Sequence, residues 1–237
     1  MIGLPTAECR YAYWRDEQGV ISRNVSPPGH DLHDGDVYLS QVPGYARRPP
    51  RFDSQGNQRG RVRSNVGYTL DAVNQVLDGM NGPPGWHQLT ASQVFAGYLV
   101  LDALVANTDR HPKNWAVLER RSDGALSIAP TFDHGSALGS GLTDEKRAAR
   151  DAATFCRKGM ANPFASGGER LLDLARRAVR EANARFWLER VDQLTPEHFS
   201  YALDAPSGRL SVVASTFMQQ VLTINRERLC DADDGKV

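Results

Sequence analysis

The pattern of hydrophobic and polar residues changes its period near residue 65. Before that point, two β-prone runs, 7–15 (AECRYAYWR) and 19–25 (GVISRNV), are joined by the charged, turn-forming DEQG. This pattern predicts an antiparallel hairpin. Residues 26–64 hold many of the proline and glycine residues and several charges, so we expect mostly loop there, with a short helix near 36–42.

From Tyr68 onward the apolar residues repeat at helical spacing, and that segment ends at Gly79. A second helix is predicted to begin at Thr90, whose hydroxyl can cap it while Gln93 reaches back to the cap. Its residues up to Val105 are apolar around most of the circumference, which indicates burial on most sides. We therefore expect this helix to be the central one. The apolar positions of the first helix are Leu70, Val73, Val76 and Leu77.

The chain then returns briefly to a β pattern before a long helical part. Two short apolar runs, 115–119 and 125–129, are separated by RRSDG, whose Asp-Gly pair predicts a hairpin turn. Everything beyond residue 143 is predicted to be helical. The expected fold class is α+β, with a small β-containing amino-terminal part on a large helical lobe that carries one inserted hairpin. The predicted helices span 169–182, 184–191 and 210–229, with Thr143 and Thr195 as caps.

Composition narrows the possible partners and locations. The 237 residues include 41% hydrophobic residues, enough for a full core, and 28 basic residues balance 28 acidic ones. A net charge of zero favours neither nucleic acid nor a membrane surface. The sequence contains neither a membrane-spanning apolar run nor a signal-peptide pattern, so we expect a cytoplasmic protein. Three widely spaced cysteines, at 9, 156 and 230, argue against a disulfide framework and predict reduced, partly buried thiols.

The basic residues are unevenly divided between arginine and lysine. Only four of the 28 are lysine, which leaves 24 arginines, and the first lysine is Lys113. This imbalance bears on any site that requires a lysine in the first half of the chain.

Three polar residues lie at positions in the predicted fold that favour an active site. Asp109 lies on the loop that follows the predicted buried helix, and Asn114 follows it five residues later. Asp133 comes just after the predicted hairpin, which reverses the direction of the chain. Phosphoryl transfer requires a carboxylate that orients or deprotonates the attacking hydroxyl, together with oxygen ligands for magnesium. Asp109 fits the base, and Asn114 and Asp133 fit the metal ligands. The alternative is that all three are ordinary turn formers, although their order along the chain favours a site.

A second polar stretch, HDLHDGD at residues 30–36, has the composition of a metal site. Its ligands would all come from one heptapeptide without a known cage spacing. We therefore interpret it as a solvated loop.

The segments NTDRHPKN (107–114) and APTFDHGSALG (129–139) resemble the catalytic and metal-binding loops of HipA-like serine/threonine kinases. The DRHPKN portion also resembles phosphatidylinositol 3- and 4-kinases. Further counterparts in bacterial HipA-like proteins extend the resemblance over most of residues 2–147. They are GLPTAECRYAYW, GVISRNV, FAGYLVLDALVANTDRH and LTDEKR.

The resemblance implies a protein-kinase-like fold, ATP as donor, Mg²⁺ as cofactor and a protein Ser/Thr hydroxyl as acceptor. Residues 1–64 would be a remnant of the amino-terminal lobe. Residues 65–237 would form the helical lobe, with the catalytic loop at 106–114 and the metal-binding loop at 131–139. Toxin–antitoxin membership and an antitoxin-like partner are implied as well. By position, Asp109 would be the catalytic base, and Asn114 and Asp133 the magnesium ligands.

Neighbouring residues receive roles from the same resemblance. His111 would act beside the base, either by contacting the transferring phosphate or by bracing the loop. Arg110 would bind the phosphate of the nucleotide or remain solvated. His134 takes the place of an aromatic residue that packs, and Gly135 would let the loop turn sharply.

Two parts of a complete kinase of this type are not evident. A strand lysine and a glycine-rich phosphate loop are expected near the start. The GSALGSG run at 135–141 is better interpreted as an activation-type segment. A longer start, a second polypeptide that supplies an amino-terminal lobe, or a degenerate kinase would each account for this.

The alternatives to a kinase are a catalytically silent nucleotide- or protein-binding module, a lipid kinase and a nucleic-acid binder. The missing lysine favours the first. The lipid kinase depends on DRHPKN alone, and the nucleic-acid binder is disfavoured by the zero net charge. One basic stripe between residues 47 and 63 is interpreted as a solvated loop or a contact for phosphate or an acidic partner. It comprises Arg47, Arg48, Arg51, Arg59, Arg61 and Arg63.

Overall fold

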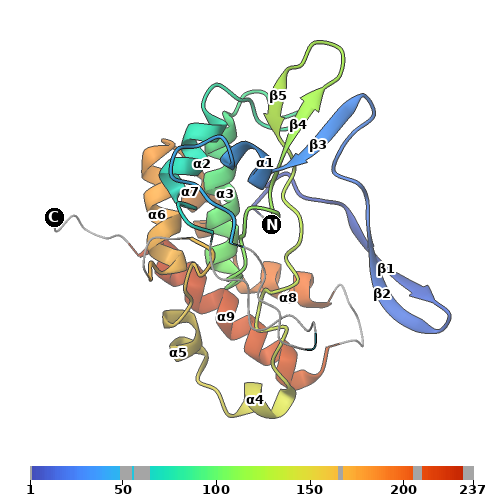
Figure 1. The fold of residues 1–237 in the computed structure, drawn as a ribbon. Helices are drawn as coiled ribbons and strands as arrows, with labels where there is room; N and C mark the ends of the chain where they lie inside the picture. The colour runs from blue at the N-terminus through green and yellow to red at the C-terminus, as the bar shows by residue number, and fades with distance from the viewer. Residues whose placement is uncertain (1, 49–54, 56–64, 165–167, 205–209, 232–237) are drawn as a thin grey trace.

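A computed structural model describes residues 2–48, 55, 65–164, 168–204 and 210–231. Helices form the main body, a three-stranded sheet lies beside it, and a separate hairpin projects away from both (Figure 1). The strands are β1 Cys9–Trp14, β2 Glu17–Ser22, β3 His30–Asp34, β4 Ala116–Arg120 and β5 Leu126–Ile128. The helices are α1 Gly35–Leu39, α2 Leu70–Leu77, α3 Ala91–Leu104, α4 Asp144–Ala148, α5 Ala152–Arg157, α6 Leu171–Glu181, α7 Phe186–Asp192, α8 Pro196–Asp204 and α9 Val212–Cys230.

The projecting hairpin is β1–β2, paired antiparallel as predicted. Its turn is formed by Arg15 and Asp16, both at positive φ (48° and 66°), so only Asp16 of the predicted DEQG turn takes part. Two consecutive residues of this kind make a turn whose twist matches that of the strands. Glu17 therefore already pairs with Trp14 inside the ladder.

The three-stranded sheet has the order β3–β4–β5 and is antiparallel throughout. The predicted β4–β5 hairpin is confirmed, with Gly124 at φ 72° in its turn. Strand β3 was not predicted, since residues 26–64 were expected to be mostly loop. The strand contains a single apolar residue, Leu32, so no alternation indicates it, and its backbone pairing with β4 holds it in place. The short helix expected near 36–42 is α1, which ends at Leu39.

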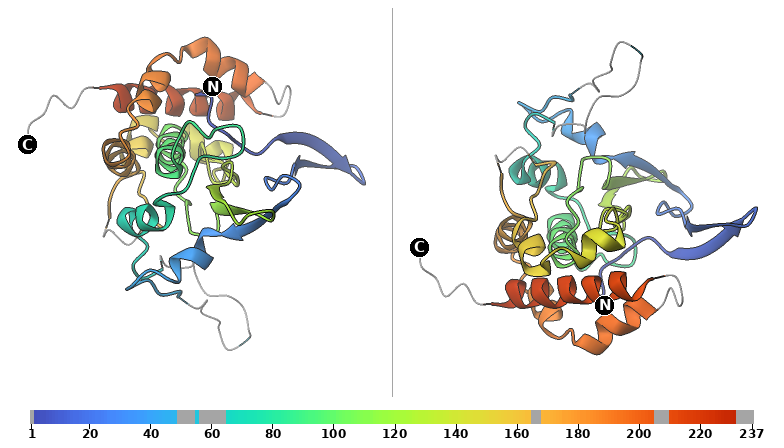
Figure 2. Two further views of the ribbon diagram at one scale, coloured as in Figure 1. Left: turned by 90° about the horizontal axis from the view of Figure 1, so that it is seen from above. Right: turned by 90° about the horizontal axis from the view of Figure 1, so that it is seen from below.

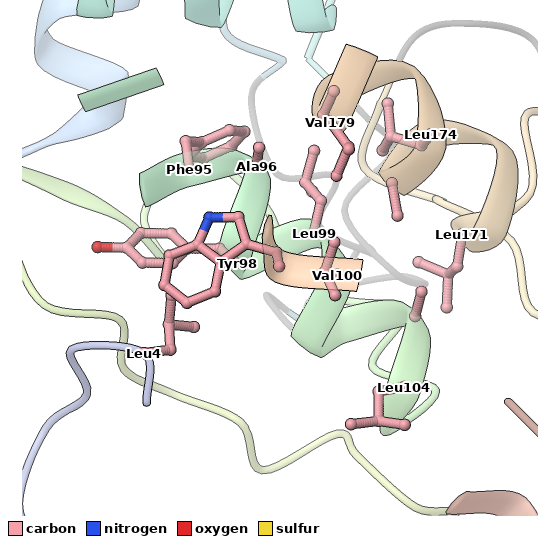
Figure 3. Packing of buried hydrophobic residues seen from close by; sticks show 14 of the residues in the cluster. Leu4, Phe95, Ala96, Tyr98, Leu99, Val100, Leu104, Leu171, Leu174 and Val179 are labelled. Atoms are coloured by element: carbon pink, nitrogen blue, oxygen red, sulfur yellow. The ribbon is translucent and has the colours of Figure 1, made fainter. Parts of the chain in front are cut away.

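Helix α3 is the central helix, as the sequence predicts. The side chain of Thr90 accepts a hydrogen bond from the Gln93 amide (3.2 Å), and the Gln93 side chain accepts one from the Thr90 amide (3.0 Å), completing the capping box. Leu99 and Val100 lie on the side of α3 that faces α6 (Figure 3), whereas Phe95 contacts the rings of Tyr98 and Trp115. Gly97 allows Leu4 and Trp187 to pack directly on the backbone of α3, because a Cβ there would lie 2.6 Å from Leu4 and 2.7 Å from the Trp187 ring.

The carboxyl-terminal part is helical, as predicted beyond residue 143. In both views of Figure 2, α3 is seen nearly along its axis, whereas α9 lies across it. The Asn225 side chain of α9 donates to the carbonyl of Leu104 (3.2 Å), so α9 supports the end of α3. Thr143 caps α4 as expected. Among the residues that the structure describes, no helix is long and apolar enough to cross a bilayer.

Candidate active site at the end of α3

The site begins where α3 ends and the chain reverses. Ala106 has φ 53°, an uncommon conformation for a residue with a side chain, and it stops the helix. The carbonyl of Val105 accepts a hydrogen bond from the Leu138 amide (2.7 Å). This bond joins the predicted catalytic loop at its start to the far end of the predicted metal-binding loop.

A buried ion pair holds the predicted catalytic loop. Arg110 donates from Nε to Asp102 Oδ2 and from Nη2 to Asp102 Oδ1, both at 2.8 Å. Both side chains are at most 2% exposed. Burial opposes the charge of the guanidinium, but the attraction of Asp102 outweighs it and keeps the pKa of Arg110 above its ordinary value.

Arg110 was expected from the sequence to bind a nucleotide phosphate or to be solvated, but its side chain is buried and bonded to Asp102. Its Nη1 donates to the carbonyl of Asn114 (2.6 Å) and lies 3.5 Å from the carbonyl of Phe132. The guanidinium thus ties both loops to α3. The physical reason for the difference is Asp102, the only charged residue of α3, whose buried carboxylate requires a buried partner.

Further polar groups complete this network. Asn107 donates to Asp102 Oδ1 (2.8 Å), and its side-chain oxygen lies 3.3 Å from the Asp109 amide. The Tyr68 hydroxyl donates to the carbonyl of Arg110 (3.0 Å) and accepts from the indole of Trp115 (3.2 Å). The side chains of Tyr68 and Asn107 therefore hold the backbone of the loop in place.

Asp109 lies above this network with its carboxylate exposed. Its carbonyl accepts a hydrogen bond from the Asn114 side-chain nitrogen (2.7 Å), and Asn114 is almost fully buried. This bond determines which end of the amide is engaged by the protein. The Asn114 side-chain oxygen is left as the atom of that amide suited to a cation.

Asp133 follows a bridge that pairs Thr131 with Thr6. It is exposed and has φ 56°, so the sharp turn of this loop occurs at Asp133 itself and at Leu138 (φ 52°). Gly135 was expected to supply that turn, yet its φ is not positive. Strained backbone of this kind is often found where a side chain must be presented in one direction.

His134 is half-buried and its Nε2 lies 3.0 Å from the Thr131 hydroxyl, consistent with the packing role expected for it. Burial, together with the nearby charge of Arg110, lowers the pKa of His134 below its ordinary value. His111 accepts a hydrogen bond at Nδ1 from the Lys113 amide (3.2 Å). That contact braces the loop.

The two loops meet at one pair of side chains. The Ser136 hydroxyl lies 3.5 Å from Asp109 Oδ2, and it belongs to the turn that follows Asp133. Asn114 is joined to the same place, because its side-chain nitrogen donates to the carbonyl of Asp109. The contact brings an exposed carboxylate and an exposed hydroxyl together where the two loops meet.

The other polar stretches serve other contacts. In HDLHDGD, expected as a loop, Asp31 pairs with Arg121 (2.7 Å) and His33 with Glu119 (3.2 Å), both across to the β4 side of the sheet. Asp36 is buried and pairs with Arg47 (2.6 Å). Arg47 of the basic stripe therefore pairs with a carboxylate of this chain. Arg51, Arg59, Arg61 and Arg63 lie outside the described residues.

The cysteines lie apart from the site. All three are free, and Cys156 is buried, whereas Cys9 is exposed, contrary to the expectation of partial burial for every thiol. Burial raises the pKa of the Cys156 and Cys230 thiols to about 11.

Sequence reasoning missed three residues of the site: Asp102, Asn107 and Ser136. A charge inside an apolar helix was a signal for Asp102, since such a group requires a partner nearby. Asn107 and Ser136 carry no such signal, because polar residues are ordinary in loops.

Comparison with solved structures relates this geometry to known proteins. The crystal structure of a Helicobacter pylori proinflammatory kinase, CtkA, superposes with a TM-score of 0.66 at 16% sequence identity, over 97% of this chain and 79% of that one. The fold is similar to that of a known kinase. At this identity the likeness extends to the fold alone.

A Shewanella oneidensis MR-1 toxin–antitoxin complex of HipA, HipB and operator DNA gives a TM-score of 0.43 at 13% identity. That value is too low to establish a shared fold, and the chain spans about half (55%) of the length of that protein. No family model matches the sequence, and no curated protein matches it.

Proposed function

We propose that the protein is an ATP-dependent phosphotransferase, similar to the HipA-like kinases, that passes the γ-phosphoryl group to a Ser or Thr hydroxyl of a protein. The observation that carries the proposal is the contact between the Asp109 carboxylate and the Ser136 hydroxyl at 3.5 Å on an exposed rim. A hydroxyl beside an exposed carboxylate is what a base-assisted transfer requires, and such contacts are often long without substrate.

In this mechanism Asp109 orients the acceptor hydroxyl and takes its proton. Asn107 and Asn114 hold the backbone on both sides of Asp109, so the carboxylate needs little rearrangement before it acts. Arg110 acts through the loops it ties to α3 and is a positioning residue. His111 braces the loop through Nδ1, which leaves Nε2 as the ring nitrogen for a phosphate oxygen.

The residues present fit Mg²⁺. Asn114 and Asp133 would hold it, because the Asn114 nitrogen is engaged by a carbonyl and Asp133 presents an exposed carboxylate. When bound, the ion would neutralise phosphate charge. The protein acceptor, an antitoxin-like or amino-terminal-lobe partner and a cytoplasmic location remain predictions.

The first test is thermal stability in the presence of ATP and Mg²⁺, separately and together. We expect Tm to rise only with both present and the rise to be lost in Asp133→Ala, since that carboxylate would hold the ion. Asp78→Ala, which removes an exposed carboxylate at the end of α2, is the matched control and should keep the rise. An equal rise in Asp133→Ala would contradict the assignment.

A catalytically silent binding module is the second candidate, favoured by two observations. Hairpin β1–β2 exposes Tyr13, Trp14 and Ile21, each at least 60% accessible, and no lysine precedes Lys113. Large apolar side chains gathered on a projecting hairpin are typical of a surface that contacts another protein. Binding of Mg²⁺ and ATP with no phosphoryl transfer to any acceptor would favour this candidate.

A further inference from the structure

The segment that follows Asp133 is built as a succession of tight turns. The Ala137 amide donates to the carbonyl of His134 (3.1 Å), and the Ser140 amide donates to that of Ala137 (2.9 Å). Ser136 therefore occupies the third position of the first turn. Its exposed hydroxyl is presented by ordered backbone.

Two further contacts hold this segment against the body. The Leu138 amide bonds to the end of α3, and Arg147 donates to the carbonyls of Gly139 (3.2 Å) and Ser140 (3.4 Å). Arg147 is itself only 10% exposed and pairs with Asp144 (2.8 Å). Ser136 is thus held near Asp109 from both sides of the turn.

We propose that Ser136 is an intramolecular acceptor of the phosphoryl group, so that the chain phosphorylates itself in cis. The inference rests on the proposed function above. Ser136 Oγ takes the position of a substrate hydroxyl, at 3.5 Å from the carboxylate that would receive its proton. The proposed metal ligand Asp133 lies in the same loop, three residues away.

The reaction balances with a nucleoside triphosphate as the donor. Ser136 Oγ forms a bond to the γ-phosphorus, the bond from that phosphorus to the bridging oxygen of the diphosphate breaks, and the nucleoside diphosphate leaves. The hydroxyl proton passes to Asp109. One phosphate is added per chain.

The contact itself can be tested without nucleotide. In a Cys9→Ser background, the pair Asp109→Cys and Ser136→Cys should form a disulfide under mild oxidation. The pair Asp109→Cys and Ser200→Cys, with the second thiol on α8, should not. Absence of the first cross-link would overturn the proposed contact.

The second test maps phosphate after incubation of the full chain with millimolar ATP and Mg²⁺. Mass spectrometry should find it on Ser136, at an initial rate per chain that does not change with protein concentration. Asp109→Asn should reduce incorporation at least ~100-fold, the contribution of a positioned base. Ser136→Ala should abolish it, Ser136→Thr should restore it, and Ser200→Ala should leave it unchanged.

The outcomes separate this inference from the proposed function. Transfer to an added protein acceptor with Ser136 unmodified would overturn the inference and leave the function standing. A rate that rises with protein concentration would replace the cis reaction by one between two chains. If nucleotide did not stabilise the protein and no acceptor were phosphorylated, both the inference and the proposed function would be overturned.

Discussion

At the scale of residues, the decisive feature is a charge that the core must neutralise. Asp102 is fully buried, and its two oxygens are used by Arg110 and Asn107. A buried pair of this kind adds little net stability relative to apolar residues, but removal of one partner leaves the other charge uncompensated. We therefore expect the pair to act mainly in positioning the predicted catalytic loop.

We expect Arg110→Met to lower the free energy of unfolding by about 3–5 kcal/mol, because Asp102 would remain buried without its partner. Chemical denaturation followed by circular dichroism measures this change. The double variant Asp102→Leu, Arg110→Met should cost less than the sum of the two single variants.

Arg120→Met is the matched control, since it breaks an exposed pair of similar geometry with Asp123. Its effect on unfolding should be small. If Arg110→Met were no more destabilising than Arg120→Met, the assigned role of the buried pair would be wrong.

At the scale of elements, α3 connects the core to the site. Its start is determined by the Thr90–Gln93 capping box, and its end by Ala106 and by the Asn225 contact to Leu104. The predicted catalytic loop follows the end of this helix directly, so the position of the loop depends on that of the helix. Stability lost at the start of α3 should therefore be transmitted to the site.

Thr90→Ala should lower the free energy of unfolding by about 1 kcal/mol, the usual cost of a lost amino-terminal cap. Ser92→Ala, two residues further on and outside the capping pair, is the control and should be close to neutral. Thermal or urea unfolding of the two variants measures the difference. Equal stabilities would indicate that the capping box contributes little.

At the scale of the whole molecule, the described chain divides into a densely packed body and a projecting hairpin (Figure 1). The body buries α3 among α6, α7 and α9. The hairpin β1–β2 pairs only with itself within the described residues and leaves most of its side chains exposed. An isolated two-stranded hairpin is marginally stable in water.

Hydrogen exchange should reflect this division. Amides of β1 and β2 should exchange through local opening, much faster than those of α3, whose exchange should approach the limit set by global unfolding. Exchange followed by mass spectrometry resolves the two segments. Protection of the hairpin as strong as that of α3 would show that additional contacts stabilise it.

The sequence by itself determined the elements whose residues carry a clear pattern. Periodicity indicated α2 and α3, capping residues located the start of α3, and an Asp-Gly pair located the β4–β5 turn. These features depend on neighbours within a few residues, which a single sequence displays. The order of Asp109, Asn114 and Asp133 likewise indicated a candidate site, although their roles remain proposals.

Only the tertiary structure decided the remaining features. Strand β3 forms because β4 supplies its backbone partners, and Arg110 turns inward because Asp102 lies beneath it. Ser136 meets Asp109 from 27 residues away, after a hairpin has reversed the chain. The β3–β4 pairing and the Ser136 contact join groups distant in sequence, so no local pattern of hydrophobic and polar residues encodes them. Arg110 and Asp102 are only eight residues apart, but their pairing depends on the path that the loop takes after α3.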